Sequence, residues 1–141
     1  MRFTIAIDGP AAAGKGTIAR EISRELSLAH LDTGLLYRVT AARVAEGQDP
    51  VEAARSITLD DFSRTDLRTP QISQEASRVS AIPEVRNALT DFQKEFAHRD
   101  GGAVLDGRAG VQRIVHVAEC GVGLGLGSAE QAVAVAVALI P

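Results

Sequence analysis

A lysine flanked by glycines follows an apolar run near the start of the chain. The stretch IDGPAAAGKGT, residues 7–17, places Gly9 five positions before Gly14, and Lys15 comes next. This is the spacing of a phosphate-binding loop, in which glycines let successive backbone N–H groups turn towards a phosphate and the lysine adds a compact positive charge. We predict that this stretch binds nucleotide phosphates. The alternative is a glycine-rich turn that only joins a strand to a helix.

The two residues after the lysine depart from the usual loop. Gly16 stands where Ser or Thr is typical, and Thr17 follows it, so the hydroxyl that commonly binds magnesium is displaced by one position. We predict Thr17 as the Mg²⁺ ligand. The residues predicted to bind the nucleotide phosphates are Gly9, Pro10, Ala11, Ala12, Ala13, Gly14, Lys15, Gly16 and Thr17.

The elements that must position this loop follow from the spacing of apolar residues. Residues 3–8 form a short apolar run that predicts a buried strand. A helix is expected to begin near Gly16, because Ile18, Ile22 and Leu26 then share one face. A helix start also adds the positive end of its dipole to a phosphate site. The loop therefore has the strand-loop-helix context that phosphate binding requires.

The same periodic alternation continues as far as residue 108. Polar residues 60–61 are expected in a connector, and the helix over 83–99 has the strongest apolar stripe. Strands that alternate with helices favour an α/β unit with a parallel sheet. The further predicted elements are strands at 29–31 and 103–107 and helices at 35–46, at 50–56, from Pro70 and over 83–99.

Composition limits the remaining function classes. The chain of 141 residues is 45% hydrophobic, which suits one core, and its net charge of -3 gives no general basic field for nucleic acid. Cys120 is the single cysteine, and the three histidines show no metal-ligand spacing. We find no signal-peptide pattern, and the apolar run 132–140 is shorter than the ~20 residues that span a bilayer. We expect a cytoplasmic protein with no membrane or nucleic-acid partner.

The last quarter of the chain differs in composition. Of the 33 charged residues, 30 lie in positions 1–108, whereas Ala and Val supply 14 of the 33 positions in 109–141. Alternating Gly with Val or Leu, as in GVGLGLGS, weakens both a strand and a helix. We therefore treat 109–141 as a separate Gly/Ala/Val-rich tail, and leave open whether it folds back as a strand, stays disordered or directs self-association.

Four motifs in a fixed order point to one family. LDTGLLYR (31–38), LRTPQIS (67–73), SAIPEVRNAL (80–89) and AVLDGR (103–108) follow the GKGT loop, and together they resemble bacterial cytidylate kinase, a nucleoside monophosphate kinase, over residues 3–108. The resemblance implies an α/β fold with a P-loop NTPase-like parallel sheet and flanking helices, whose C-terminal part is missing or replaced. It also implies an acceptor-binding insert at about 44–82, shorter than is usual in the family.

The resemblance assigns roles to the residues that are predicted to bind phosphate. ATP would occupy the loop, with Lys15 beside the transferring phosphoryl group. Arg38 and Arg108 would hold the phosphate of CMP, and a guanidinium suits this role because its planar fork holds two phosphate oxygens at once. Thr33 matches the small hydroxyl residue near the acceptor phosphate. Each residue also has an alternative role without a ligand: Arg38 as a surface residue of a helix, Arg108 as a surface charge at a strand end, and Thr33 as a helix cap.

The resemblance also assigns cytosine recognition to Ser77 and Arg86. A surface ion pair of Arg86 with Glu84, or a contact with the Thr90 backbone, is the alternative. Asp106 is placed with the CMP-binding residues. An acidic residue at a strand end can also order magnesium or its waters, or simply form a turn before a glycine.

The match ends where the tail begins. The family continues DGR with an aspartate that reads the cytosine amino group, whereas this chain has Ala109, and no candidate for the arginine-rich lid follows. We hypothesise that a frameshift or truncation replaced the rest of the domain.

The expected reaction is phosphoryl transfer from ATP to CMP or dCMP with Mg²⁺, catalysed by Lys15, Arg38 and Arg108 through positioning and charge neutralisation. The alternatives are an inactive nucleotide-binding remnant or another small-molecule P-loop kinase. We expect a monomer, with self-association through the tail as an open alternative.

Overall fold

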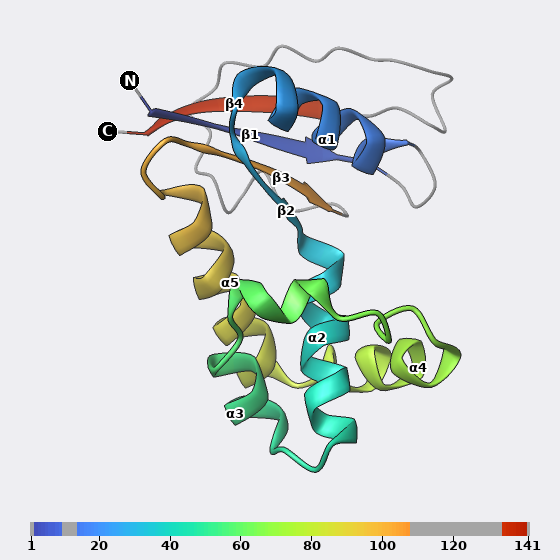
Figure 1. Cartoon of the computed structure of the whole chain (residues 1–141). Helices are drawn as coiled ribbons and strands as arrows, with labels where there is room; N and C mark the ends of the chain where they lie inside the picture. Colours follow the sequence, from blue (N-terminus) through green and yellow to red (C-terminus); the bar gives the residue numbers. More distant parts are fainter. Residues whose placement is uncertain (1, 10–13, 108–133, 141) are drawn as a thin grey trace. The chain divides into compact units, whose positions relative to one another are not determined.

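The structure is a computed structural model, and it describes residues 2–9, 14–107 and 134–140. The chain divides into two compact units, Met1–Thr33 with Gln93–Pro141, and Gly34–Phe92. The first unit contains the strands and the second is helical (Figure 1).

The first unit is built on a sheet with the strand order β2-β3-β1-β4. Its strands β1 (Arg2–Asp8), β2 (Ala29–Asp32) and β3 (Ala103–Gly107) run parallel, with Ile5 beside Val104 and Leu31 beside Leu105. Parallel neighbours require a crossover connection, which here contains helices. The predicted α/β fold with a parallel sheet is confirmed for these three strands.

The fourth strand lies in the tail whose structure the sequence left open. Strand β4 (Ala134–Ile140) pairs antiparallel with β1, with Ala138 beside Thr4. An antiparallel strand needs no crossover helix, so a returning chain can add one directly to a sheet edge. Strand β1 therefore has a partner on each side, while the GVGLGLGS segment lies outside the described residues.

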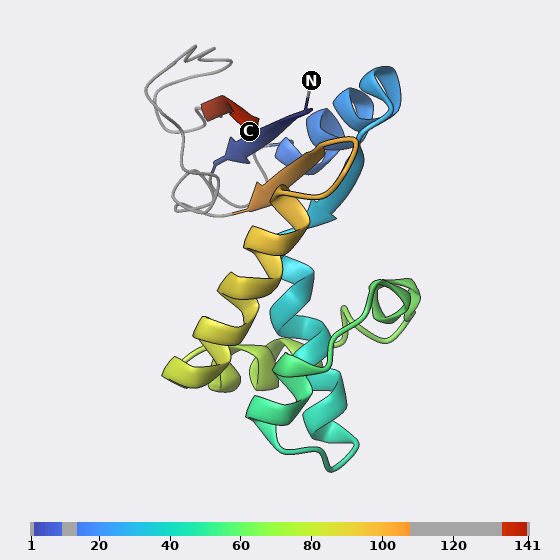
Figure 2. The ribbon, with the colours of Figure 1, turned by 90° about the vertical axis from the view of Figure 1, so that its left-hand side faces the viewer.

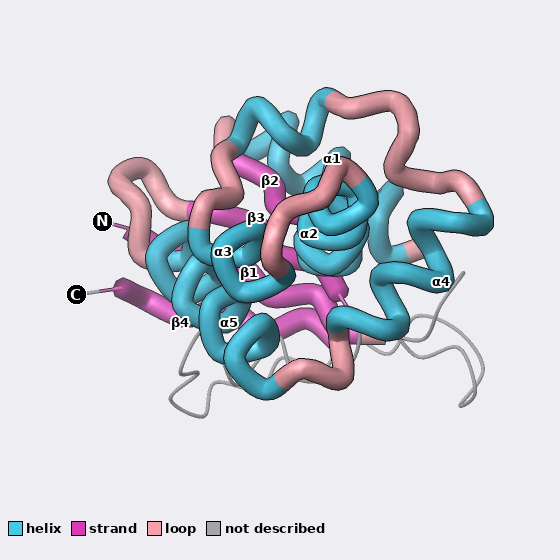
Figure 3. The backbone as a smooth tube through the Cα atoms, turned by 90° about the horizontal axis from the view of Figure 1, so that it is seen from below, coloured by secondary structure: helices cyan, strands magenta, loops and turns pink. Residues whose placement is uncertain are grey.

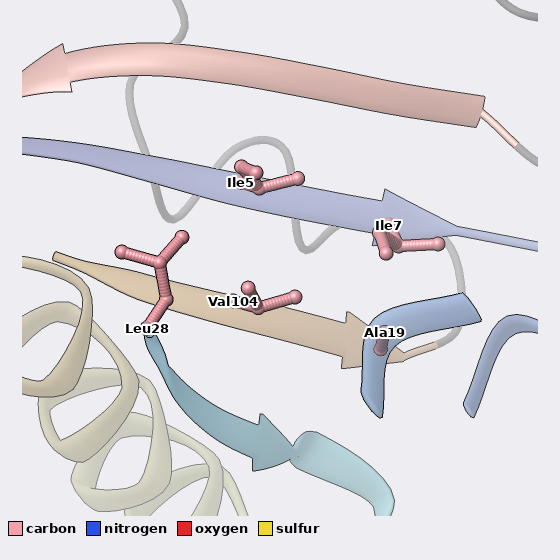
Figure 4. Close-up of a cluster of buried hydrophobic side chains, with 5 residues drawn as sticks. All are labelled: Ile5, Ile7, Ala19, Leu28 and Val104. Atoms are coloured by element: carbon pink, nitrogen blue, oxygen red, sulfur yellow. The ribbon is translucent and has the colours of Figure 1, made fainter. Parts of the chain in front are cut away.

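Helix α1 (Lys15–Leu26) packs against the strands of this sheet (Figure 1, Figure 2). Ile18 and Ile22 of its predicted apolar face join the core, whereas Leu26, at the helix end, is 49% exposed. Strand and helix side chains meet in one buried cluster (Figure 4), and burial of such side chains is the main favourable contribution to folding. The cluster contains Ile5, Ile7, Ala19, Leu28 and Val104.

A tight turn leads into β3. Gly102 adopts φ +84°, and a Cβ atom there would lie 2.3 Å from the carbonyl oxygen of Phe3. The buried hydroxyl of Thr4 donates to the carbonyl oxygen of Ala97, which ties the end of α5 (Pro83–Ala97) to β1. The glycine is therefore required by the close approach of the turn to β1.

The second unit consists of helices and has no strand within residues 34–92, all of which the structure describes (Figure 3). Two predicted helix starts are confirmed by their caps. Asp49 accepts hydrogen bonds from the N–H groups of Val51 and Glu52, and Thr69 accepts one from the N–H of Ile72. Besides α5, the helices are α2 (Thr33–Ala45), α3 (Pro50–Arg55), the 3₁₀ helix η1 (Leu59–Ser63) and α4 (Pro70–Val79).

The predicted polar connector at residues 60–61 is instead a 3₁₀ helix. Asp61 accepts a hydrogen bond of 2.8 Å from the N–H of Thr58 and forms an ion pair of 2.8 Å with Arg43 on α2. Burial alone would raise the pKa of Asp61, but these hydrogen bonds and the charge of Arg43 lower it overall. A side-chain interaction between segments distant in sequence thus orders a stretch that local propensity leaves irregular.

None of the helices in residues 15–107 combines the length and apolar character that crossing a bilayer requires. The apolar stripe predicted for α5 is confirmed, since Val85 and Leu89 are fully buried and Phe96 is 7% exposed.

Candidate functional site

The start of α1 has the features of an anion-binding site. Gly14 directly precedes the helix in the left-handed conformation, with φ 80° and ψ 8°, and its side of the turn is open, because a Cβ there would meet no atom within 4 Å. The N-cap residue Gly14 has no side chain that could cap the helix, and the first turn, residues 15–18, contains no acidic residue. The N–H groups and the positive dipole end at this terminus therefore favour an anion.

The loop residues are only partly covered by the structure. Gly9, Gly14, Lys15, Gly16 and Thr17 are described, and Lys15 is the half-buried first residue of α1. Four residues predicted to bind nucleotide phosphates lie outside the described part of the chain: Pro10, Ala11, Ala12 and Ala13.

Thr17 has the chemistry that a magnesium ligand needs. Thr17 lies exposed in the first turn of α1, and its hydroxyl accepts a long hydrogen bond of 3.5 Å from Arg20. Mg²⁺ prefers oxygen ligands and typically keeps several waters and substrate phosphates in its coordination sphere. Within the described ranges, no group of three or more His, Cys, Asp or Glu could hold a metal ion. The Thr17 hydroxyl is therefore an oxygen ligand of the kind that Mg²⁺ takes.

The carboxyl ends of the parallel strands bring three acidic residues to one edge of the sheet. Asp8 is the last residue of β1 and Asp32 the last of β2, while Asp106 lies one residue before the end of β3. In register, Asp106 faces Ile7 on one side and Asp32 on the other. The loop before α1 continues from this same edge, since it follows Asp8 directly.

Asp106 is the most constrained of these residues. Its side chain is buried, and its carboxylate contacts Nε2 of His30. Its carbonyl oxygen accepts a hydrogen bond of 2.9 Å from the hydroxyl of Thr33. Asp106 therefore lies within a strand and not in a turn. Burying a carboxylate without a partner would cost folding free energy, and the contact with His30 offsets that cost.

Thr33 is the first residue of α2, and its hydroxyl donates a hydrogen bond to the carbonyl oxygen of Asp106. The lone pairs of that hydroxyl remain able to accept a hydrogen bond. The predicted residues Thr33 and Asp106 are therefore brought together, and Arg108 lies outside the described residues.

In the helical unit, Arg38 has defined partners. Its Nη1 donates to the carbonyl oxygen of Leu67 at 3.0 Å and to the hydroxyl of Ser73 at 2.9 Å. Ser77 is exposed one turn further along α4, and its hydroxyl donates to the carbonyl oxygen of Ser73 at 3.2 Å. Arg38 thus contacts α4 one turn before Ser77.

Arg86 is exposed on α5 and, within this described helix, forms no ion pair with Glu84. Burial raises the pKa of the Tyr37 hydroxyl, and the positive charge of Arg86 opposes that rise. Tyr37 therefore lies close enough to Arg86 to sense its charge, next to Arg38 in the sequence of α2.

No functional role was predicted for His30, Tyr37 or Ser73. Tyr37 and Ser73 lie inside the quoted motifs LDTGLLYR and LRTPQIS, and His30 directly precedes the first of them. Their position in the motifs was the available signal, but their partners come from distant elements.

Comparison with known proteins identifies related sequences. The family model described as cytidylate kinase matches residues 5–64 and 51–125, so its second match extends beyond Arg108. A cytidylate kinase of Cereibacter sphaeroides (strain KD131) is 63% identical over 108 residues, covering 77% of this chain and 52% of its own length. That of Methylocella silvestris is 55% identical over 111 residues, covering 74% and 51%. That of Rhizobium meliloti (strain 1021) is 44% identical over 115 residues, covering 77% and 54%. The chain spans about half the length of the curated relatives it matches.

Proposed function

We propose, since this chain belongs to the cytidylate kinase family, that it transfers the γ-phosphoryl group of ATP to CMP or dCMP and yields ADP with CDP or dCDP. The observation that supports this most directly is the start of α1. There Gly14 adopts the left-handed conformation and Lys15 begins the helix, shortly after Asp8 at the end of β1. Such a terminus suits the phosphates of a nucleotide.

On the donor side, backbone N–H groups at the start of α1 would bind the phosphates of ATP. Lys15 would balance the negative charge of the transferring group, and Thr17 would hold Mg²⁺ together with the nucleotide. Bound Mg²⁺ would neutralise charge that develops on the phosphate oxygens.

On the acceptor side, Arg38 and Arg108 would hold the phosphate of the monophosphate, because a guanidinium fork matches two phosphate oxygens. Ser77 and Arg86 would bind the cytosine, to which Arg86 offers donors for its O2 and N3 acceptors. Thr33 and Asp106, linked by their hydrogen bond of 2.9 Å, would form the part of the acceptor site that lies on the sheet edge.

The reaction needs no covalent enzyme intermediate. An oxygen of the acceptor phosphate attacks the γ-phosphorus, the bond from that phosphorus to the bridging oxygen breaks, and ADP leaves. The protein contributes position and charge, which are the main sources of catalysis in phosphoryl transfer.

We further propose that residues 1–108 form the N-terminal part of a monophosphate kinase domain and that residues 44–82 serve as its acceptor-binding insert. Within that range the structure has α3, η1 and α4. Arg38 lies on α2 outside the range, and its hydrogen bonds to Leu67 and Ser73 support a role for the insert in acceptor binding.

A coupled assay of ADP release with CMP, dCMP, UMP and AMP tests the function. We expect turnover to prefer CMP or dCMP, and we expect Lys15→Met to lower kcat by at least about a hundredfold, because the lysine stabilises transition-state charge. The chain offers a matched control in Lys94→Met, since Lys15 and Lys94 are its only lysines and Lys94 is exposed on α5.

Three outcomes would contradict the proposal in different ways. ATP binding without turnover would favour the nucleotide-binding remnant, and preference for an unrelated acceptor would favour another P-loop kinase. Equal activity of Lys15→Met and Lys94→Met would remove Lys15 from the catalytic machinery.

A further inference from the structure

We infer that Ser73 is a positioning residue that orients Arg38 for the phosphate of the acceptor nucleotide, an inference that rests on the proposed function. Ser73 accepts a hydrogen bond of 2.9 Å from Nη1 of Arg38, and the carbonyl oxygen of Leu67 accepts one of 3.0 Å from the same nitrogen. Two acceptors, at residues 67 and 73, thus bind the same nitrogen of the guanidinium.

Because Nη1 is already hydrogen-bonded, the other nitrogens of the guanidinium determine what Arg38 can still bind. A guanidinium has five N–H donors, two of them on Nη1. Within the described part of the chain both acceptors of Arg38 lie at Nη1, which leaves the adjacent N–H groups of Nε and Nη2 as a fork for an anion. That fork is the pair of donors that grips two oxygens of a phosphate.

Both acceptors are themselves fixed. Leu67 is buried, with 4% of its surface exposed, and contributes a backbone carbonyl. Ser73 lies in the first turns of α4, whose start is set by Pro70 and by the Thr69 cap. An unrestrained arginine side chain has many rotamers, and ordering it on binding costs conformational entropy. Restraint by two anchored acceptors therefore places the fork before the nucleotide arrives, which is preorganisation.

Ser73 also connects the predicted phosphate and base contacts. Its side-chain hydroxyl accepts the hydrogen bond from Arg38. Its carbonyl oxygen accepts one of 3.2 Å from the hydroxyl of Ser77. Residues four apart share one face of a helix, so Ser73 and Ser77 lie one above the other on α4. The same helical turn would therefore align the phosphate-binding arginine with the base-binding serine.

The test compares Ser73→Ala with wild type in NMR titrations with CMP and with cytidine, which lacks the phosphate. We expect Ser73→Ala to bind CMP about three- to tenfold more weakly, the effect of losing one ordinary hydrogen bond, and to bind cytidine as wild type does. Ser73→Thr keeps the hydroxyl and is expected to restore CMP affinity. Ser80→Ala is the matched control, because Ser80 follows α4 and its hydroxyl donates to the carbonyl oxygen of Ser77.

A double-mutant cycle separates positioning from general stabilisation. In an Arg38→Ala background, Ser73→Ala is expected to cause no further loss of CMP affinity, since its partner is gone. Equal CMP binding by Ser73→Ala and wild type, or an equal loss for CMP and cytidine, would overturn the inference while leaving the proposed function intact. Failure of the wild-type chain to bind CMP at all would overturn both.

Discussion

Adjacent glycines in the turn before β3 provide a sharp test of the packing of the sheet. Gly101 and Gly102 have nearly the same φ, +87° and +84°. A Cβ at Gly101 would meet no atom within 4 Å, whereas a Cβ at Gly102 would lie 2.3 Å from the carbonyl oxygen of Phe3 and 3.1 Å from Leu28. The two substitutions to alanine therefore share the strain of a positive φ, and only Gly102→Ala adds a clash.

The magnitudes follow from these contacts. Positive φ costs an L-residue about 1–2 kcal/mol, and the reduced freedom of the unfolded chain returns about 0.4–1 kcal/mol. We therefore expect Gly101→Ala to lower the free energy of unfolding by about 1 kcal/mol. Gly102→Ala adds forced movement of the β1 backbone against the buried cluster, which costs about 1–3 kcal/mol more. Its total loss is then about 2–4 kcal/mol.

Urea unfolding followed by circular dichroism measures both variants under the same conditions. The expected result is a Gly102→Ala midpoint well below that of Gly101→Ala, with similar slopes. Equal destabilisation by the two substitutions would refute the argument, because it would mean that the turn does not approach β1 as closely as the geometry states.

Two further predictions concern ionisable groups. Because the pKa of Asp61 is lowered in the folded state, its stabilising effect is present above its unfolded pKa and is lost as pH falls through the folded value. Asp61→Asn should therefore cost about 1–3 kcal/mol at neutral pH, and urea midpoints should converge with wild type in acid. A constant difference across pH would contradict the ion pair with Arg43. His30→Leu removes the partner of the buried Asp106 carboxylate and should lower the melting temperature more than His30→Gln, which keeps a donor. Equal melting temperatures of His30→Leu and His30→Gln would show that the contact between His30 and Asp106 contributes nothing to stability.

Much of the fold was predictable because local rules decide it. The strand at residues 3–8, the helix after the loop and the helix entered at Pro70 lie within one or two residues of β1, α1 and α4. Apolar periodicity and caps act over a few residues, so they are readable directly from the chain. Residues 60–61 were misassigned as a connector because the ion pair between Asp61 and Arg43 joins positions 18 apart.

The site divides in the same way. Residue types and spacing alone predicted a phosphate-binding loop before a helix, and they placed arginines and serines in motifs typical of cytidylate kinases. Only the tertiary structure decided which partners they meet: His30 for the carboxylate of Asp106, and Ser73 for Arg38. It also decided that the tail adds an antiparallel strand to β1. The physical reason is separation along the chain, since pairings across 76 and 35 residues depend on how the helices and strands pack and leave no periodic trace in the sequence.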